Sequence, residues 1–552
     1  MRCSVPIKNS RNILCVFPAY TPSFGTFAHA FELVPGVRAF MPPQGLLIVA
    51  AYLPERWQVR FIDENIERAE PSDVDWADVV FVGGMHIQAP QIRDIQLRAK
   101  SFGKLTVLGG SAVSSSPETY PEFDYLHIGE IGDATDELIA TLDRSVEPPP
   151  VQRRFETRER LALSSFPLPR YDAVPLPRYL IGSLQFSSGC PYRCEFCDIP
   201  ALYGRQPRFK SPEQLLAELD AFVAQPGHPP VIYLVDDNFI GNRKAARDLL
   251  PHLIDWQKRR GYPLQFACEA TLNIAKQIDI LALMREAGFL TVFVGIETPE
   301  PKVLTGIDKA HNASLPMLEA IETLNRHGLE VTSGIIMGLD LETDESEARL
   351  IEFIDRSQIP IFTINVLQAL PKTPLWERLA REGRLITDQD LESNVRFLRP
   401  RGEVLASWRR AIAYAYTPER LFARFRYQVD ATYVNRLRLP AKGKLTKINL
   451  KRGLALACNI IWRIGIVSDY RAAFWRAAWH ALRRGQIEPI FGMGFVAWHL
   501  IQFTQEALGG RQNASFYAAK QYSTESLSRR TMGRVSEGPL STHRDPAAGS
   551  RQ

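Results

Sequence analysis

Cysteine is scarce in this chain, which has seven cysteines in 552 residues. The number is odd and the spacing uneven, which excludes the disulfide framework of small secreted domains. The N-terminus lacks an apolar segment followed by a small-residue cleavage site, so we expect a protein of the reducing cytoplasm. A net charge of +5 is modest for this length, and nucleic acid is therefore not an expected partner.

The composition is globular, with 45% hydrophobic residues, and the length predicts two or three domains. A run of prolines and charged residues between about 145 and 180 is typical of a surface linker. The last stretch is rich in serine, arginine and glycine and is predicted to be disordered. The expected regions are 1–145, a Rossmann-like domain; 146–180, a linker; 181–400, a partial barrel; 401–520, a helical domain; and 521–552, a tail.

Short apolar runs alternate with helix-length segments in the first region, which is typical of a doubly wound parallel sheet. The runs are Ile13–Phe17, Val59–Ile62, Val79–Val82, Leu105–Leu108 and Tyr125–Ile128. Several runs end in glycine, at the sheet edge where such folds bind ligands. Tight turns explain any single glycine pair equally well. No GxGxxG motif is present, which argues against a standard dinucleotide site.

A second set of apolar runs predicts six βα units, arranged as a partial parallel barrel that is open on one side. The runs are Leu184–Ser187, Val231–Val235, Phe266–Ala270, Thr291–Gly295, Val331–Met337 and Phe362–Leu367. Ser211, Pro212 and Gln214 predict a helix start with a capping box. Barrel chemistry takes place at the carboxyl ends of the strands, and a group of cysteines follows the first run.

Three of the seven cysteines lie within eight residues, at Cys190, Cys194 and Cys197. Thiolates bind zinc and iron–sulfur clusters. A structural zinc site needs a fourth ligand, which Asp198 or a distant histidine would have to supply. Three thiolates in one loop can instead hold three irons of a [4Fe–4S] cluster and leave the fourth iron open.

The spacing Cys-x3-Cys-x2-Cys, with an aromatic residue before the last cysteine, resembles the signature of the radical S-adenosylmethionine family. The resemblance implies that the open iron binds S-adenosylmethionine and that its cleavage yields a 5′-deoxyadenosyl radical. It also implies S-adenosylmethionine contacts at Phe196, Asp236, Asp237, Glu297 and Gly338. Helix capping is an equally good explanation for the two aspartates.

The first region resembles the cobalamin-binding domain that precedes the barrel in cobalamin-dependent members of this family. Met41-Pro42-Pro43-Gln44-Gly45-Leu46 is similar to their PPxGL loop. The cobalamin contacts implied in this way are Pro43, Gln44, Gly45, Gly83, Gly84, Gly109, Gly110, Ser111, Gly129 and Glu130. The Asp-x-His-x-x-Gly motif, whose histidine ligates cobalt in other cobalamin domains, is absent, and a degenerate domain that binds nothing is the alternative.

Between Lys442 and Arg484 the charge is almost entirely positive, with Asp469 as the single acid, and three tryptophans are interleaved. Basic helices with tryptophan on the apolar side are typical of membrane surfaces. The uncharged stretch Ile490–Phe503 is too short to span a bilayer core of about 30 Å. A helical cap on the barrel is the alternative and is compatible with peripheral membrane contact, whereas RNA binding has no supporting module.

Longer stretches in all three regions resemble the hopanoid C-2 methylases, among them "VRAFMPPQGLL", "VDDNFIGNRKAA", "CEATLNIAK" and "QALPKTPLW". This resemblance implies methyl transfer to C-2 of a triterpenoid lipid, with a [4Fe–4S] cluster, S-adenosylmethionine and cobalamin as cofactors. It also implies an electron donor such as flavodoxin or ferredoxin. Two alternatives remain, namely a related enzyme that acts on a tetrapyrrole or other small molecule, and a non-catalytic protein that binds cobalamin, zinc or a lipid.

Overall fold

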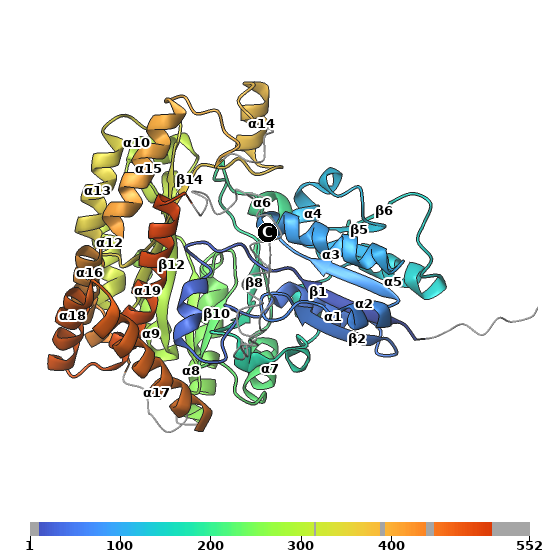
Figure 1. Ribbon diagram of the computed structural model, residues 1–552, viewed down its shortest axis with the longest axis horizontal. Coiled ribbons are helices and arrows are strands. Elements are labelled where there is room, and N and C mark those ends of the chain that lie inside the picture. Colours follow the sequence, from blue (N-terminus) through green and yellow to red (C-terminus); the bar gives the residue numbers. More distant parts are fainter. Residues whose placement is uncertain (1–9, 314–315, 387–391, 438–446, 511–552) are drawn as a thin grey trace, which may run out of the picture.

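Two six-stranded parallel β-sheets, formed one after the other along the chain, organise the computed structural model of this protein (Figure 1). The structure describes residues 10–313, 316–386, 392–437 and 447–510. The tail predicted at 521–552 therefore lies outside the described residues. Helices follow the second sheet, so the expected α/β architecture with a helical C-terminal region is confirmed.

The first sheet has the strand order β2-β1-β3-β4-β5-β6, which is a doubly wound topology. Five strands lie where short apolar runs predicted them, because strands covered on both faces are apolar almost throughout. They are β1 (Asn12–Phe17), β2 (Gln58–Asp63), β3 (Val79–Gly83), β4 (Leu105–Gly109) and β5 (Tyr125–Ile128). The helices are α1 (Gln44–Tyr52), α2 (Pro71–Trp76), α3 (Ala89–Ser101), α4 (Ser111–Ser115) and α5 (Asp133–Arg144).

One segment that we predicted as linker belongs to this sheet. Residues Arg153–Glu156 form β6, which pairs in parallel with β5 at the sheet edge. Only Phe155 of this strand is buried, and its other three side chains are exposed. An edge strand with one covered position needs no apolar run, so its charged sequence conceals it.

The second sheet has the order β14-β13-β12-β11-β10-β7, with parallel neighbours throughout and open edges at β7 and β14. This is the expected partial barrel. Its strands are β7 (Gly182–Leu184), β10 (Val231–Leu234), β11 (Gln265–Glu269), β12 (Phe289–Glu297), β13 (Glu330–Met337) and β14 (Ile361–Val366). The main intervening helices are α7 (Pro212–Val223), α8 (Arg243–Arg260), α9 (Ile278–Ala287), α10 (Pro301–Gly306), α12 (Met317–Arg326) and α13 (Ser346–Ser357).

Two local details of the barrel differ from the sequence expectation. The first strand begins at Gly182, and Ser187–Ser188 instead forms β8, which pairs antiparallel with β9 (Arg208–Phe209). The Ser211 hydroxyl caps α7 by accepting from the Gln214 amide at 3.2 Å. The reciprocal bond of a capping box is replaced, because the Gln214 side chain donates to carbonyls of the 163–166 segment.

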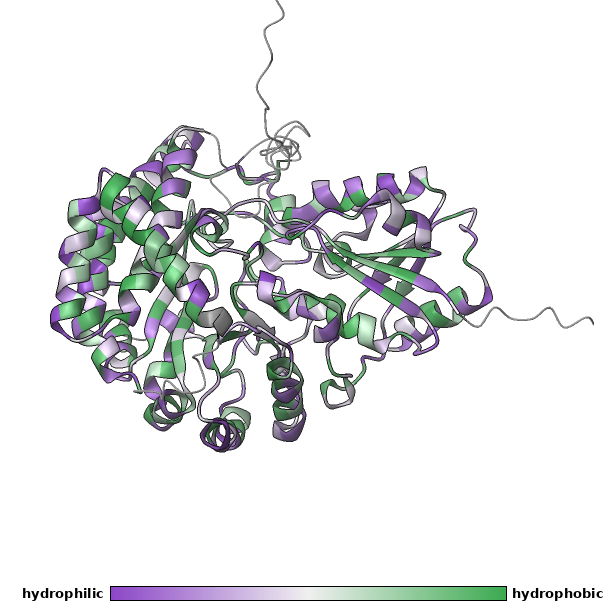
Figure 2. Cartoon of the chain, turned by 60° about the horizontal axis from the view of Figure 1, so that its bottom comes forward, coloured by the Kyte–Doolittle hydropathy of each residue, from purple (hydrophilic) through white to green (hydrophobic). Residues whose placement is uncertain are grey.

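In the described residues from 401 to 510, five long helices pack on the barrel and share one continuous apolar core with it. Figure 2 shows these outer helices alternating between hydrophobic and hydrophilic residues, as helices with one buried face do. They are α15 (Arg401–Ala415), α16 (Pro418–Ala431), α17 (Lys447–Ile460), α18 (Arg471–Arg483) and α19 (Glu488–Leu508). The helical cap is therefore confirmed, and within the described residues no helix is long and apolar enough to cross a membrane.

Candidate functional site

The cysteine loop, residues 189–198, follows the first barrel strand and is anchored at its start by backbone contacts. Gly189 has a φ of 96°, and a Cβ there would lie 3.0 Å from the Gly204 carbonyl oxygen. The Cys190 amide donates to that same carbonyl at 3.2 Å. The glycine before the first cysteine thus provides a left-handed turn that places the loop at the carboxyl end of the barrel.

The two aspartates after β10 hold this loop in place. One Asp236 carboxylate oxygen accepts from the amides of Phe186 and Ser187, at 2.7 and 2.5 Å, and Asp237 accepts from the Gly189 amide at 2.7 Å. Burial raises the pKa of Asp236 to about 7 and that of Asp237 to about 6. Neither residue caps a helix, since Asn242 caps α8. The structure therefore places both side chains on the backbone that leads into the cysteine loop.

The three thiols of the loop are free and largely shielded from water. Burial raises the pKa of all three, that of Cys194 to about 11, and the nearby Lys309 ammonium partly opposes the shift at Cys190 and Cys194. A buried thiolate needs a positive charge beside it. A bound metal ion supplies that charge, and its thiol ligands therefore lose their protons. The donor set and its environment therefore fit iron of a cluster.

No group of three His, Cys, Asp or Glu side chains converges as ligands of a single metal ion in the part of the chain that the structure describes. A [4Fe–4S] cluster makes no such demand, because each thiolate binds a different iron. Three spaced thiols on one loop agree with that arrangement.

A buried ion pair lies beside the cysteine loop, at the end of β12. The Lys309 ammonium lies 2.5 Å from one Glu297 carboxylate oxygen, and both side chains are less than 10% exposed. Burial opposes the positive charge of Lys309, but attraction to Glu297 and to the nearby Cys194 and Cys197 sulfurs together raises the Lys309 pKa. A Cβ at Gly295 would lie 2.4 Å from the Glu297 carboxylate, so that glycine leaves room for the pair. Glu297 is a predicted S-adenosylmethionine contact, whereas no sequence motif pointed to Lys309.

Glu297 itself has a φ of 66°, a conformation that non-glycine residues rarely adopt. Such strain is concentrated at functional sites, where the surrounding structure maintains it. The backbone register between β12 and β13 shifts at this point. Glu297, whose backbone is strained, its partner Lys309 and the cysteine loop thus all lie at the carboxyl end of the barrel.

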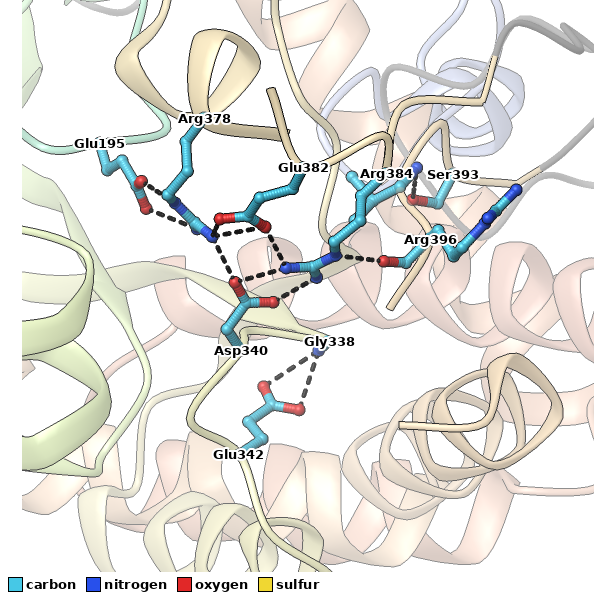
Figure 3. Close-up of polar contacts among 10 residues, drawn as sticks. Glu195, Gly338, Asp340, Glu342, Arg378, Glu382, Arg384, Ser393 and Arg396 are labelled. Atoms are coloured by element: carbon cyan, nitrogen blue, oxygen red, sulfur yellow. Dashed lines mark hydrogen bonds and ion pairs between the residues drawn. The ribbon is translucent and has the colours of Figure 1, made fainter. Parts of the chain in front are cut away.

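Two other candidate S-adenosylmethionine contacts already have protein partners. The Phe196 ring faces the Lys309 ammonium at 5.6 Å from its centroid. The Gly338 amide donates to both carboxylate oxygens of Glu342, at 3.0 and 2.9 Å (Figure 3). A Cβ at Gly338 would lie 2.8 Å from the Phe397 ring. The glycine at 338 is therefore accounted for by packing within the protein.

The glycines at the carboxyl edge of the first sheet fall into two groups. Side chains at Gly84, Gly110 and Gly129 would collide with or crowd protein atoms; a Cβ at Gly110, for example, would lie 2.8 Å from the Gly84 carbonyl oxygen. Gly45 and Gly109 face open space, because no atom lies closer than 4.0 Å to a Cβ built there. The three atoms nearest to a Cβ built at Gly83 all belong to the flexible Leu46 side chain. Tight packing thus explains the first group, whereas the second leaves room for a ligand.

The PPxGL-like loop turns toward the barrel. Pro43 precedes α1, and the Gln44 side chain accepts from the hydroxyls of Tyr171 and Ser183, at 3.2 and 3.3 Å. Ser183 lies on β7 and also donates to the Pro42 carbonyl. The Gln44 amide nitrogen is buried and has no hydrogen-bond partner among the residues that the structure describes. This loop therefore joins the two sheets and carries one unsatisfied donor.

Glu130 reaches across to the barrel and touches the approach to the cysteine loop. Its carboxylate accepts from Ser188 at 3.2 Å and pairs with Arg208 at 2.6 Å and Arg160 at 3.2 Å. Ser114, which the sequence did not single out, accepts through its hydroxyl from the Gly129 amide at 2.9 Å. It lies on the short helix that Ser111 begins. The carboxyl edge of the first sheet, where cobalamin contacts are predicted, thus lies next to the approach to the cysteine loop.

Family comparisons divide the chain in the same way as the fold. The model of the radical SAM superfamily matches residues 184–354, and a model described as a domain of unknown function (DUF4070) matches residues 373–513. The hopanoid C-2 methylase of Rhodopseudomonas palustris (strain TIE-1) is 55% identical over 513 residues, which cover 93% of this chain and 97% of that protein.

Two solved structures share the fold at low sequence identity. TsrM from Kitasatospora setae, a radical S-adenosylmethionine methyltransferase solved with cobalamin and a [4Fe–4S] cluster, has a TM-score of 0.54 at 18% identity. That match covers 82% of this chain and 99% of TsrM. OxsB, a cobalamin-dependent S-adenosylmethionine radical enzyme, has a TM-score of 0.57 at 15% identity, covering 93% and 82% of the two chains. At these identities the likeness establishes a common architecture.

Proposed function

Since the chain belongs to the hopanoid C-2 methylase family, within the radical SAM superfamily, we propose that it methylates C-2 of a hopanoid lipid. The observation that carries this proposal is 55% identity over 97% of the relative's length. That match includes the sheet domain, the barrel and the C-terminal helices together. A shared barrel alone would leave the substrate undefined, because one fold serves many substrates.

In this proposal each cofactor has its own part of the site. Cys190, Cys194 and Cys197 hold the [4Fe–4S] cluster, and Glu297 contacts S-adenosylmethionine. Cobalamin would be held at the edge of the first sheet, where Gly45 and Gly109 leave room for it. When bound, these groups supply the electron, the radical and the methyl group, which are chemistry that side chains do not provide.

The protein's own task is to orient these groups and to exclude water. Asp236 and Asp237 fix the backbone that leads into the cysteine loop. Lys309 neutralises Glu297 in a buried setting, and Glu130 joins the sheet edge to the barrel beside that loop. A reductant of the flavodoxin or ferredoxin type would deliver the electron.

Lipid analysis tests the function directly. We expect that expression of the chain in a hopanoid-producing strain without 2-methylhopanoids yields hopanoids that are heavier by one CH₂ unit. Mass-spectrometric fragmentation should locate the added carbon in ring A. The matched control is the same strain carrying Cys194→Ala.

Unchanged hopanoids together with a methylated tetrapyrrole would instead support the tetrapyrrole alternative. Production of neither, by a protein that binds cobalamin but forms no 5′-deoxyadenosine, would support the non-catalytic binding protein.

We also propose peripheral membrane contact through the C-terminal helices, since hopanoids are membrane lipids. Three tryptophans there are exposed, Trp462 at 62%, Trp475 at 42% and Trp479 at 56%. Trp475 donates to the Gly465 carbonyl at 2.8 Å, which joins α18 to the segment that contains Trp462. Further exposed apolar residues on these elements are Leu450, Leu454, Ile461, Ile466, Val467, Leu482 and Ile487.

Basic side chains lie among these apolar residues on α18. Arg471 and Arg476 bond backbone carbonyls of their own segment, and Arg483 lies over the Trp479 ring at 5.4 Å. Their charges are therefore available to an anionic surface. Exposed tryptophan with arginine on one helix is typical of interfacial binding.

Liposome flotation tests this contact. Each basic residue near an anionic surface contributes about 1 kcal/mol, so R471Q/R476Q/R483Q should bind phosphatidylglycerol vesicles roughly 100-fold more weakly. Trp462→Ser combined with Trp479→Ser should weaken binding further. Leu97→Ser, which alters an equally exposed apolar residue on α3, serves as the control. Equal flotation of all variants, or flotation that does not depend on anionic lipid, would refute the electrostatic part.

A further inference from the structure

A short segment after the last barrel strand contacts both the first domain and the cysteine loop. Lys372–Arg378 precedes and begins α14 (Pro374–Arg381). At one end, the Lys372 ammonium donates to the Ser114 carbonyl of the first domain at 2.6 Å. Further along, the Leu375 amide donates to the Glu195 carbonyl, inside the cysteine loop, at 2.9 Å. We call this segment the strap.

Arg378 ends the strap with a two-pronged bond to the Glu195 side chain. Its Nε and Nη2 atoms donate to the two carboxylate oxygens at 2.5 and 3.1 Å (Figure 3). Glu195 lies between Cys194 and Cys197, and its side chain is 11% exposed. Its own amide donates to the Ile307 carbonyl at 3.0 Å. The residue between two predicted cluster ligands is therefore held at its amide, its carbonyl and its carboxylate.

The arginine is in turn held by a charged network. Asp340 accepts from Arg378 at 2.7 Å and from Arg384 at 2.5 Å, and Glu382 contacts both arginines (Figure 3). Asp340 follows β13, so this network ties α14 to the barrel. A planar guanidinium held on both sides has little rotational freedom and positions its carboxylate partner accurately.

The backbone of the strap is also fixed. Lys372 has a φ of 65°, which is unusual for a residue with a side chain. The fully buried Thr373 hydroxyl caps α14 by accepting from the Trp376 amide at 3.1 Å, and it donates to the Leu370 carbonyl at 2.6 Å. These bonds fix the backbone from which the side chains of Lys372 and Arg378 extend.

Ser114 connects the strap to the cobalamin side. Its carbonyl binds Lys372, and its hydroxyl binds the Gly129 amide. Gly129 and residues 109–111 are among the predicted cobalamin contacts, and we call the edge of the first sheet that holds them the corrin-facing edge. The strap thus contacts the first domain through Ser114 and the cysteine loop through Glu195.

We propose that Lys372–Arg378 is a positioning strap that fixes the cysteine loop relative to the corrin-facing edge of the first domain. The proposal rests on the proposed function, which assigns the cluster to that loop and cobalamin to that edge. Arg378 acts on the cluster through Glu195, and Lys372 acts on the separation of the cofactors through Ser114. Neither residue is assigned a part in bond making or breaking.

The Arg378 arm is tested by iron release from the anaerobically reconstituted full chain into a chelator. Loss of a hydrogen-bond partner of a metal ligand typically costs about 10- to 100-fold in metal affinity. Arg378 bonds Glu195, which is the neighbour of a ligand and not a ligand itself, so we expect Arg378→Gln to release iron faster by no more than about 10-fold. Arg378→Lys keeps the charge but loses the fork, so it should be intermediate. Arg381→Gln changes an exposed arginine on the same helix and should match the wild type. Equal release by R378Q and R381Q would overturn this arm.

The Lys372 arm is tested by Lys372→Met, which keeps the side-chain stem and removes the ammonium. Both cofactors should bind as in the wild type, but pulsed dipolar EPR between cob(II)alamin and the reduced cluster should give a broader distance distribution. More 5′-deoxyadenosine should form for each methylated lipid. An unchanged distance distribution would overturn the strap.

Iron release and the EPR distance distribution are both independent of methylation. Shifts in iron release and in EPR distance, in a chain that makes no 2-methylhopanoid, would retain the strap and reject the proposed substrate. A methylating chain whose iron release and EPR distances do not respond to the substitutions would do the reverse.

Discussion

Cys194→Ala is expected to lower cluster iron to background and to abolish 5′-deoxyadenosine formation. Two remaining thiolates cannot hold a cluster that needs three protein ligands. Changing a residue that bonds a metal ligand typically lowers metal affinity about 10- to 100-fold. The loss of cluster affinity in Cys194→Ala should be larger, because the ligand itself is removed. Anaerobic reconstitution followed by iron and sulfide determination and product chromatography measures both effects.

Cys458→Ala is the matched control, since Cys458 is an exposed free cysteine on α17, outside the cysteine loop. It should leave cluster content and 5′-deoxyadenosine formation unchanged. Full 5′-deoxyadenosine production by Cys194→Ala would show that Cys194 is not a cluster ligand, and the assignment of the loop would have to be withdrawn.

Lys309→Met is expected to destabilise the apo chain by about 3–5 kcal/mol, because it leaves the Glu297 carboxylate buried without a counter-charge. The pair is 2.5 Å apart and almost fully buried. The double variant Glu297→Gln/Lys309→Met removes both charges and should regain most of the lost stability. Urea unfolding of the wild type, the single variants Glu297→Gln and Lys309→Met, and the double variant gives the coupling free energy.

Lys302→Met provides the control for this series, since Lys302 is an exposed lysine on the neighbouring helix α10. Surface changes of this kind usually stay within about 0.5 kcal/mol. A Lys309→Met chain as stable as Lys302→Met would mean that Glu297 is not charged in the folded protein.

The strands of both sheets could be predicted because buried parallel strands are short and almost uniformly apolar. The cysteine loop could be predicted because its ligands are adjacent in sequence. The strand Arg153–Glu156 could not, since it has one covered position, at Phe155. This segment is a strand because it pairs with β5, and no local sequence pattern indicates that pairing.

Contacts between distant segments account for the rest of what the sequence did not reveal. Arg378 and Glu195 are 183 residues apart, and Lys372 and Ser114 are 258 residues apart. Glu195 lies inside the cysteine motif, so a carboxylate between two thiolate ligands was a usable signal. Gly110 stays a predicted cobalamin contact, and only the structure shows that a side chain there would collide with the Gly84 backbone.

One iron of the proposed cluster that no side chain binds is central to the proposed function. EPR spectroscopy of the reconstituted and reduced chain, recorded before and after adding S-adenosylmethionine, tests this directly. We predict a [4Fe–4S]⁺ signal whose g-values shift when S-adenosylmethionine is added, with no such shift for a cluster that is fully ligated by protein. An unshifted signal, or reconstituted protein without a cluster, would contradict the account.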